Sequence, residues 1–325
     1  LSSSYKKEII FNLSPASGYR SRCEFGYKNG SYTMVKNGKK VLLDHFDLPV
    51  SAIQNIMKPL LEAINANPLI NKKLFQINFR AVNQIVLVTL IYHKQLDQNW
   101  LESARIIETK LDINVLGRSK NQLLATHLTE LEQYIDINPS YYLYQNDKTF
   151  YQPNAFLMPK MVKLVISLIE NPRDLLELYC GSGTFTIPLS YSFKNVFATE
   201  NNRESISYLK KSIHKNHIKN IFYARLSDIE LMDAYKGRIF RRLENIDLKN
   251  FNFSHVLVDP PRSGLSHNVT EILNKFENII YISCNPDTFK RDLDKLKDYR
   301  IKKLEVFDQF SNTPHLELIA LLIKR

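Results

Sequence analysis

The chain has 325 residues, of which 44% are hydrophobic and 24% are charged, and its formal net charge is +11. A chain of this length buries a sizeable core and typically forms about two domains. The composition excludes a disordered or repeat protein, and the longest apolar run, residues 85–92, is too short to span a bilayer. The basic excess suits a polyanionic partner, although it also occurs in proteins that never bind nucleic acid.

The start of the chain lacks the apolar stretch of a secretion signal and begins without Met. We therefore expect a cytoplasmic protein with a trimmed N-terminus. Cys23, Cys180 and Cys284 lie far apart, with no CxxC pair and no histidine at metal-ligand spacing. This pattern excludes a disulfide framework and a zinc or iron–sulfur site, so no metal is expected. Cys23 and Cys180 are predicted to be small core residues.

The first 149 residues mix strand-like and helical segments, which predicts a self-contained α+β domain without catalytic features. Strands are expected at residues 20–25, 31–35, 74–79 and 85–92, with a turn at Lys28-Asn29-Gly30. Helices are expected at residues 50–66 and 100–111.

Residues 150–325 alternate regularly between helices and apolar strands, which predicts a second, α/β domain. Strands are expected at residues 175–179, 195–199, 221–224, 255–258, 279–283, 302–307 and 316–323. Helices are expected at residues 155–169 and 205–216, among others. This order predicts a doubly wound, mostly parallel sheet of seven strands. Ligands of such sheets bind beyond the carboxyl ends of the strands, so residues just past each strand are the functional candidates.

A glycine-containing turn, LELYCGSGTF at residues 176–185, follows the first of these strands. Its two glycines let the backbone approach a ligand closely, and the next helix offers free N–H groups. The second strand ends in Glu200, whose carboxylate can accept hydrogen bonds from ribose hydroxyls. Together they indicate a cofactor that carries a nucleoside; a tight turn without ligand is the alternative. The third glycine of NAD sites is absent, and the loop resembles the SAM-binding loop of class I methyltransferases.

Polar residues also follow the third and fourth strands. Asp228 either faces an adenine edge or caps the helix that begins DIEL. Asp259 precedes two prolines, which fix the backbone and hold its carboxylate in place. In amino-methyltransferases a similar Asp-Pro-Pro precedes an aromatic residue that stacks on the target base. Arg262 stands at that position here, which argues against an exocyclic amine as the target.

Cys284 follows the fifth strand on the expected ligand side, directly before Asn-Pro, a position that a buried core thiol explains poorly. A thiolate can add to C6 of uracil and so activate C5, which is otherwise a poor nucleophile. A base must then remove the C5 proton, and Glu317 at the start of the last strand is the candidate. A plain surface acid is the alternative for Glu317, and His315 is the weaker candidate for the base.

Six ordered motifs resemble those of the RNA uracil-C5 methyltransferase family, and the similarity covers essentially the whole chain. They are FYQPN (150–154), LELYCGSGTF (176–185), ATE (198–200), VDPPRSG (258–264), YISCNP (281–286) and HLEL (315–318). The N-terminal half is similar to the family members that act on tRNA, in YRSRCEF (19–25), LFQI (74–77), IYHK (91–94) and LGR (116–118).

The resemblance implies SAM-dependent formation of 5-methyluridine at uridine 54 of the tRNA T-loop, with the first domain binding RNA. It implies Cys284 as nucleophile and Glu317 as the proton-abstracting base. Positions that contact SAM in the family fall on Gln152, Tyr179, Thr184, Glu200 and Asp259. The family usually has Asn where this chain has Thr184, which weakens that side-chain contact. The four-Cys iron–sulfur cluster and added small domain of ribosomal RNA relatives are absent from this sequence.

The expected partner is the T-arm of tRNA, and no membrane, metal or obligate protein partner is evident. Alternatives are a 23S rRNA uridine C5-methyltransferase and a tRNA-binding folding factor with secondary methylation. The target base would be flipped into a cleft between the two domains. Phe75 is a candidate to stack on a base, or else a core residue. Arg238, Arg241 and Arg242 are candidate phosphate contacts, or else part of a solvated basic loop.

Overall fold

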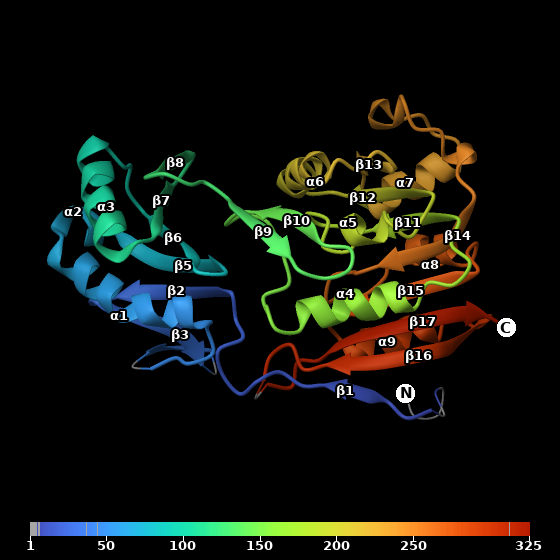
Figure 1. Ribbon diagram of the computed structural model, residues 1–325, viewed down its shortest axis with the longest axis horizontal. Helices are drawn as coiled ribbons and strands as arrows, with labels where there is room; N and C mark the ends of the chain where they lie inside the picture. The colour runs from blue at the N-terminus through green and yellow to red at the C-terminus, as the bar shows by residue number, and fades with distance from the viewer. Residues whose placement is uncertain (1–4, 6, 37, 44, 312) are drawn as a thin grey trace.

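The computed structural model describes residues 5, 7–36, 38–43, 45–311 and 313–325. In this part of the chain the strands form two large sheets, which lie side by side, and one separate hairpin (Figure 1). The strands are β1 (Ile10–Asn12), β2 (Arg22–Lys28), β3 (Ser31–Lys36), β4 (Lys39–Leu42), β5 (Leu74–Val82), β6 (Ile85–Tyr92), β7 (Asn114–Ser119), β8 (Gln122–Ala125), β9 (Leu131–Ile135), β10 (Tyr141–Gln145), β11 (Asp174–Leu178), β12 (Asn195–Glu200), β13 (Ile221–Arg225), β14 (Phe253–Val258), β15 (Asn278–Ser283), β16 (Tyr299–Phe307) and β17 (Glu317–Lys324).

The helices include two short 3₁₀ turns between α7 and β14. They are α1 (Ser51–Ala66), α2 (Pro68–Asn71), α3 (Gln98–Leu111), α4 (Met158–Ser167), α5 (Thr186–Leu189), α6 (Arg203–Lys215), α7 (Asp228–Tyr235), η1 (Arg241–Leu243), η2 (Leu248–Asn250), α8 (His267–Leu273) and α9 (Pro286–Leu293). Within the described residues, no helix is both long enough and apolar enough to cross a membrane.

The C-terminal sheet has the strand order β1-β16-β17-β15-β14-β11-β12-β13. Strand β17 runs antiparallel to both β15 and β16, and the other recorded pairings in this sheet are parallel. The chain moves outward from β11 through β12 to β13 and then returns to β14 on the other side of β11. This reversal creates the switch point at which a doubly wound sheet binds its ligand.

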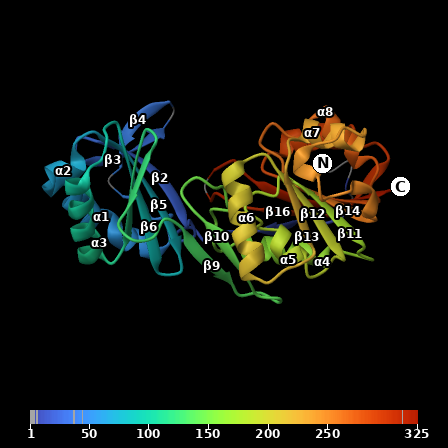
Figure 2. The ribbon, with the colours of Figure 1, turned by 90° about the horizontal axis from the view of Figure 1, so that it is seen from above.

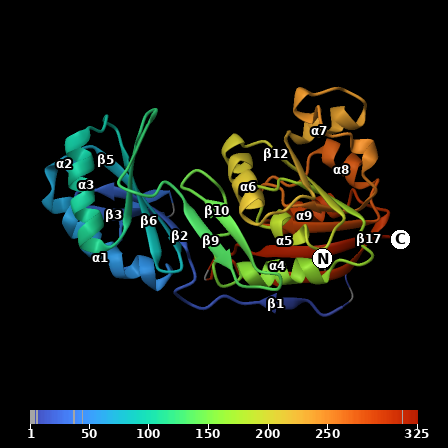
Figure 3. The ribbon, with the colours of Figure 1, turned by 45° about the horizontal axis from the view of Figure 1, so that its top comes forward.

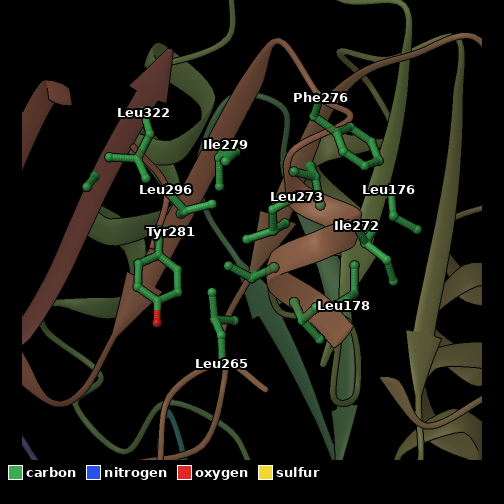
Figure 4. Close-up of a cluster of buried hydrophobic side chains, with 14 of the residues drawn as sticks. Leu176, Leu178, Leu265, Ile272, Leu273, Phe276, Ile279, Tyr281, Leu296 and Leu322 are labelled. Atoms are coloured by element: carbon green, nitrogen blue, oxygen red, sulfur yellow. The ribbon is translucent and has the colours of Figure 1, made fainter. Parts of the chain in front are cut away.

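Both faces of this sheet are covered by helices, as its almost continuously apolar strands require. Alternate residues of β11 face opposite sides: Leu175 packs with helices α4, α5 and α6, whereas Leu176 packs with α7, α8 and α9. Figure 4 shows the second cluster, in which Ile272 of α8 lies against the sheet with Ile279 of β15. The expected doubly wound, mostly parallel sheet is thus confirmed.

The sheet has eight strands where seven were expected, because β1 is added at its edge. Ile10, Phe11 and Asn12 pair in parallel with Glu305, Val306 and Phe307 of β16. A segment of three residues has no readable alternation, and its partner lies near the other end of the chain. The sequence pattern around residues 10–12 therefore could not predict this strand.

The N-terminal sheet has the order β4-β3-β2-β5-β6-β7-β8, in which β6 and β7 are parallel and the other neighbours antiparallel. Helix α3 connects β6 to β7, because the chain must cross back to the start of the sheet before it can form a second parallel strand. Its Trp100 is buried with Ile53 and Leu60 of α1 in one core beneath the sheet. These helices and β2, β3, β5 and β6 confirm the expected mixed α+β architecture of this part of the chain.

The hairpin of β9 and β10 lies between the two sheets (Figures 2 and 3). The backbone of β10, the outer strand of this hairpin, forms hydrogen bonds with side chains of α6 and of Asn216, the residue that caps the end of α6. The Asn216 side chain bonds both the N–H and the C=O of Tyr142, each at 2.8 Å, and Ser212 Oγ accepts from Tyr144 N at 3.1 Å. The hairpin is thereby fixed to the C-terminal part of the molecule.

Candidate active site

Three of the predicted site residues meet where β14, β15 and β17 lie side by side. Ser283 is paired with Leu318, so in this antiparallel register the next residue, Cys284, comes beside Glu317. Val258 is paired with Tyr281, which brings the following residue, Asp259, level with the end of β15. Cys284 is half-buried and Glu317 is buried. The strand register therefore places one thiol and two carboxyl groups at one edge of the sheet.

Burial raises the pKa of all three groups, and neighbouring charges add to the shift at Glu317 and Cys284. Burial raises the pKa of Asp259 to about 7. Burial, reinforced by the charge of Asp259, raises the pKa of Glu317 well above its usual range. Burial and the neighbouring Glu317 and Asp259 also raise the pKa of the Cys284 thiol. Arg262 opposes the shifts of Glu317 and Cys284, since a cation favours their charged forms.

The loop that carries Asp259 and Arg262 is held by side chains at and within α9. Asn285 Nδ2 donates to Arg262 O at 3.2 Å, and Arg291 Nη2 donates to Ser263 O at 2.9 Å. The buried carboxylate of Asp292 accepts from Leu265 N at 2.7 Å. Sequence reasoning missed these residues, since nothing in RDLDKL shows that Asp292 is buried beneath a loop.

The same helix begins beside the thiol. Asn285 caps α9 by accepting from Asp287 N at 3.0 Å, and Pro286 occupies the first turn, where its missing N–H costs nothing. Cys284 therefore lies directly before the positive end of a helix dipole. That end favours a thiolate, in opposition to the two carboxyl groups.

The glycine-containing turn forms a second polar site at the carboxyl ends of β11, β12 and β13. Tyr179 and Gly181 both adopt left-handed backbone angles, with φ of 60° and 56°. Glu200 accepts from Gly181 N at 3.1 Å and from Asn202 N at 2.7 Å, which fixes its carboxylate at the end of β12. Tyr179, Glu200 and Asp228 line one cavity.

This cavity fits the nucleoside part of SAM. A Cβ added to Gly181 would meet open space, so the backbone there is free to lie against a ligand. The carboxylates of Glu200 and Asp228 at the cavity wall are acceptors suited to the hydroxyl and amino groups of a nucleoside. Glu177 of β11 is buried, and among the described residues one of its carboxyl oxygens has no hydrogen-bond partner; burial raises its pKa to about 8.

The structure does not place every predicted cofactor contact on this cavity. Gln152 is buried, and its side chain accepts from Gln309 Nε2 at 3.2 Å. Thr184 is half-buried between the turn and α5. The capping role considered for Asp228 is wrong: Ser227 caps α7 in a capping box with Glu230, which leaves Asp228 in the first turn. There the Asp228 carboxylate accepts from Ser266 Oγ at 2.6 Å.

Other candidates can now be placed. Cys23 and Cys180 are buried, as expected. His315 is exposed, with its ring against Phe310. Phe75 is half-buried and stacks on His93, with ring centroids 3.8 Å apart. Among the residues described, no group of three or more His, Cys, Asp or Glu side chains is arranged to hold a metal ion.

The basic connection between α7 and β14 lies away from the reaction centre. It leads into the amino end of β14, whereas Asp259 follows the carboxyl end of that strand. Arg238 is paired with Asp233, and Arg242 with Glu230. Because two of its three arginines are already paired, this geometry favours a solvated basic loop over a set of phosphate contacts.

Comparisons with known proteins agree with this architecture. The family model described as tRNA (Uracil-5-)-methyltransferase matches residues 2–325. The tRNA/tmRNA (uracil-C(5))-methyltransferase of Campylobacter concisus is 42% identical, over 96% of this chain and 88% of that protein. The protein of the same name from Saccharophagus degradans is 39% identical, over 99% and 92%. The crystal structure of Pyrococcus abyssi tRNA (uracil-54, C5)-methyltransferase in complex with S-adenosyl-L-homocysteine has a TM-score of 0.78 at 22% identity, over 99% of this chain and 80% of that one.

The strand order, the glycine turn after β11 and the acid that ends β12 define a class I methyltransferase that uses S-adenosyl-L-methionine. The sequence comparisons narrow this class further. The chain belongs to the tRNA (uracil-5-)-methyltransferase family. The resemblance to RNA uracil-C5 methyltransferases is therefore confirmed, and the protein is an enzyme.

Proposed function

We propose that this enzyme forms 5-methyluridine at uridine 54 of the tRNA T-loop, with Cys284 as nucleophile and Glu317 as base. The observation that carries the proposal is the strand register that sets Cys284 beside Glu317. The family supports uracil C5 as the methylated atom, and the similar Pyrococcus abyssi protein is named for uracil 54. The substrate is a cytoplasmic RNA, so the enzyme is assigned to the cytoplasm.

Cys284 starts the reaction by forming a bond between its Sγ and C6 of the uracil ring. The electron pair of the C5–C6 double bond then makes C5 a nucleophile, as an enolate with the C4 carbonyl. SAM, when bound, supplies the methyl group as an electrophile. The half-buried thiol needs to lose its proton for this step, and Arg262 and the start of α9 favour the thiolate.

Glu317 completes the reaction by taking the proton from C5 after that atom has been methylated. The C5–H electron pair re-forms the C5–C6 double bond, and the Sγ–C6 bond breaks. The raised pKa of Glu317 suits a base, since a carboxylate in a buried site holds a proton more strongly than one in water. The proton returns to solvent when the RNA leaves.

The cofactor would be held at the other polar site. Tyr179, Glu200 and Asp228 line the cavity that fits the nucleoside, and Asp259 lies between this cavity and Cys284 in the strand order. Gln152 and Thr184 are assigned to the cofactor on the family motif alone. This arrangement directs a bound methyl donor toward the edge at which Cys284 and Glu317 meet.

The RNA would be held jointly by the N-terminal part, residues 1–149, and the catalytic part, residues 150–325. The Phe75–His93 stack offers a half-exposed aromatic surface on the N-terminal sheet. Such a surface stacks on bases that are splayed out of an RNA loop.

Methylation of an unmodified tRNA transcript tests the proposed substrate. The purified protein should transfer labelled methyl groups from SAM to the T-loop uridine, located by mapping of the labelled nucleotide. A transcript with cytidine at position 54 serves as the matched control and should receive no label. Relatives are named for tmRNA as well as tRNA, so a tmRNA transcript is the second substrate to test. Label confined to ribosomal RNA would contradict the proposal.

A further inference from the structure

A pocket of about 290 Å³ lies where the N-terminal sheet meets residues 150–153 and the loop after β16. We call it the junction pocket. Its volume is near the lower end of the range for small-molecule sites. Its lining combines aromatic side chains with two basic residues and one acid, and includes Arg20, Arg22, Glu24, Phe46, Phe150 and Phe310.

Two arginines, Arg20 and Arg22, line this pocket, and a third, Arg80, lies next to Arg22 on the neighbouring strand. Arg22 of β2 is paired directly with Arg80 of β5, and side chains of such a pair lie on the same face. Arg20 stands two positions before Arg22, and its backbone bridges to Pro49 and Asn154. A bend at Ser21 separates the two residues, and both side chains line the pocket. Arg20, Arg22 and Arg80 therefore form one arginine cluster.

The arginine cluster has too few acidic partners. Arg22 is paired with Glu24. The other nearby acid, Asp147, follows β10 and is paired with Arg118. Arg80 is almost fully buried; one nitrogen donates to Thr149 O at 2.8 Å, and its Nε and Nη1 find no hydrogen-bond partner in the part of the chain that the structure describes. Within the described residues the Arg20 side chain has no hydrogen bond either. The cluster thus keeps a net positive charge, which favours an anion at the pocket.

Aromatic rings lie beside this charge. Phe150 is 60% exposed, so its ring is accessible to a ligand in the pocket. The Arg20 guanidinium lies 5.4 Å from the centre of the Phe310 ring, which sets the cation and the aromatic face together. An anion-binding cluster next to aromatic rings is the combination that holds a nucleotide of single-stranded RNA.

The junction pocket lies close to both polar sites of the enzyme. Phe310 belongs to the loop between β16 and β17, whose next strand begins with Glu317. The backbone carbonyl of Phe150 accepts from Ser182 Oγ of the cofactor turn at 3.5 Å. A nucleotide in this pocket would therefore be a near neighbour of the reacting uridine.

We propose that the junction pocket binds one nucleotide of the RNA substrate that flanks the target uridine. Arg20 and Arg22 hold its phosphate, Arg80 supplies charge beneath them, and the base lies against Phe150 and Phe310. The assignment rests on the proposed function, because it takes RNA as the substrate. It adds a site that fixes the position of the loop before Cys284 reacts.

The test compares two variants whose effects differ in kind. Arg20→Gln removes the phosphate contact, and Phe150→Leu removes the ring but keeps an apolar side chain. Arg300→Gln is the matched control. The Arg300 side chain is exposed and lies near the amino end of β16, whereas Phe307, the strand partner of Glu317, lies at the carboxyl end of β16. Binding of an unmodified tRNA transcript is measured without SAM at several salt concentrations. SAM affinity and the melting temperature are measured on the same preparations.

Arg20→Gln should weaken RNA binding by about tenfold to a hundredfold and reduce the slope of log K against log salt by about 0.7, since one phosphate contact is lost. Phe150→Leu should weaken binding by about fivefold to a hundredfold with the wild-type salt slope, because stacking releases no counterions. Arg300→Gln should bind RNA as the wild type does. All three should keep wild-type SAM affinity.

The proposal is overturned if Arg20→Gln matches Arg300→Gln, or if its lost affinity leaves the salt slope unchanged. It is also overturned if Phe150→Leu binds RNA as tightly as the wild type, or if SAM affinity falls in parallel with RNA affinity. These results leave the proposed function intact as long as the wild type methylates tRNA. A wild type that neither binds nor methylates tRNA would defeat both.

Discussion

The same two neighbours, Asp259 and Arg262, shift the pKa values of both Cys284 and Glu317. Burial raises the pKa of the thiol and of the carboxyl group, and the charge of Asp259 raises both further. At neutral pH the thiol is therefore mostly protonated. Arg262 is the cation that counters these effects at both residues. Removal of the Cys284 proton therefore depends on Arg262 and on the start of α9, which both favour the thiolate.

The two residues should fail differently when they are replaced. Cys284→Ala cannot add to C6, so it should bind tRNA but form no adduct and transfer no methyl group. Glu317→Gln keeps the thiol and the shape of the site but cannot take the C5 proton. It should methylate C5 and then stall with RNA bonded to Cys284, because elimination needs that proton to leave. A denaturing gel would show a slow band that carries label from SAM.

Cys23→Ala provides the control for this experiment, because Cys23 is a buried thiol on the N-terminal sheet. Combined with Glu317→Gln, it should leave the slow band in place. A band that survives in Cys284→Ala would rule out this nucleophile. Turnover of Glu317→Gln at the wild-type rate would move the base role to Asp259 or His315.

At the scale of elements, two glycines in the turn between β11 and α5 have different roles. Gly183 packs closely against Leu209, whereas Gly181 is open on the side where a ligand would lie. Gly183→Ala places a Cβ 2.7 Å from Leu209 Cδ1 at a φ of 101°, so it should lower the free energy of unfolding by about 2–4 kcal/mol. Gly181→Ala meets open space and should cost only about 1 kcal/mol, while weakening SAM binding by at least about tenfold. Urea unfolding and calorimetry measure the two effects. Equal losses of stability would contradict this division.

Elements with strong local patterns were predictable, and elements that depend on distant partners were not. Helix α1 and strand β6 begin and end within one residue of expectation, because each has an unbroken apolar pattern. Strand β10 has its outer edge paired by Asn216 and Ser212, which no local pattern shows. Its partner β9 was missed for the same reason, as was β1.

The candidate site was predictable to the extent that strand ends define it. Cys284 and Glu317 were located because each adjoins the end of a recognisable strand. Asp292 was missed, because its burial depends on Leu265 and Tyr281 from other elements. The arginine cluster was missed because Arg22 and Arg80 are brought together only by the pairing of β2 with β5.

At the scale of the whole molecule, buried carboxyl groups make the stability of the fold depend on pH. The pKa of Glu177 is raised from 4.5 to about 8 by burial, so the folded state holds this proton more tightly than the unfolded state. The stabilisation is complete below about pH 4.5 and is lost as the pH rises through 8.

Glu177→Gln should therefore leave stability at pH 5 nearly unchanged and raise the free energy of unfolding at pH 8 by on the order of 3 kcal/mol. Urea unfolding of the cofactor-free protein between these two values measures the difference. The exposed Glu62 provides the control variant, Glu62→Gln, which should follow the wild type throughout. A difference that stays constant between pH 5 and pH 8 would show that Glu177 is not protonated in the folded state.

The pairing of β1 with β16 has a consequence for the newly made chain. The bond from Asn12 Nδ2 to Glu305 Oε2, 3.0 Å long, joins residues that are 293 positions apart. At a synthesis rate of about 5–20 residues per second, β1 waits roughly 15–60 seconds for its partner to be translated. Strand β17, which carries Glu317, is made later still. A nascent chain on the ribosome therefore contains Cys284 before it contains Glu317, and the two residues can meet only after β17 has been translated.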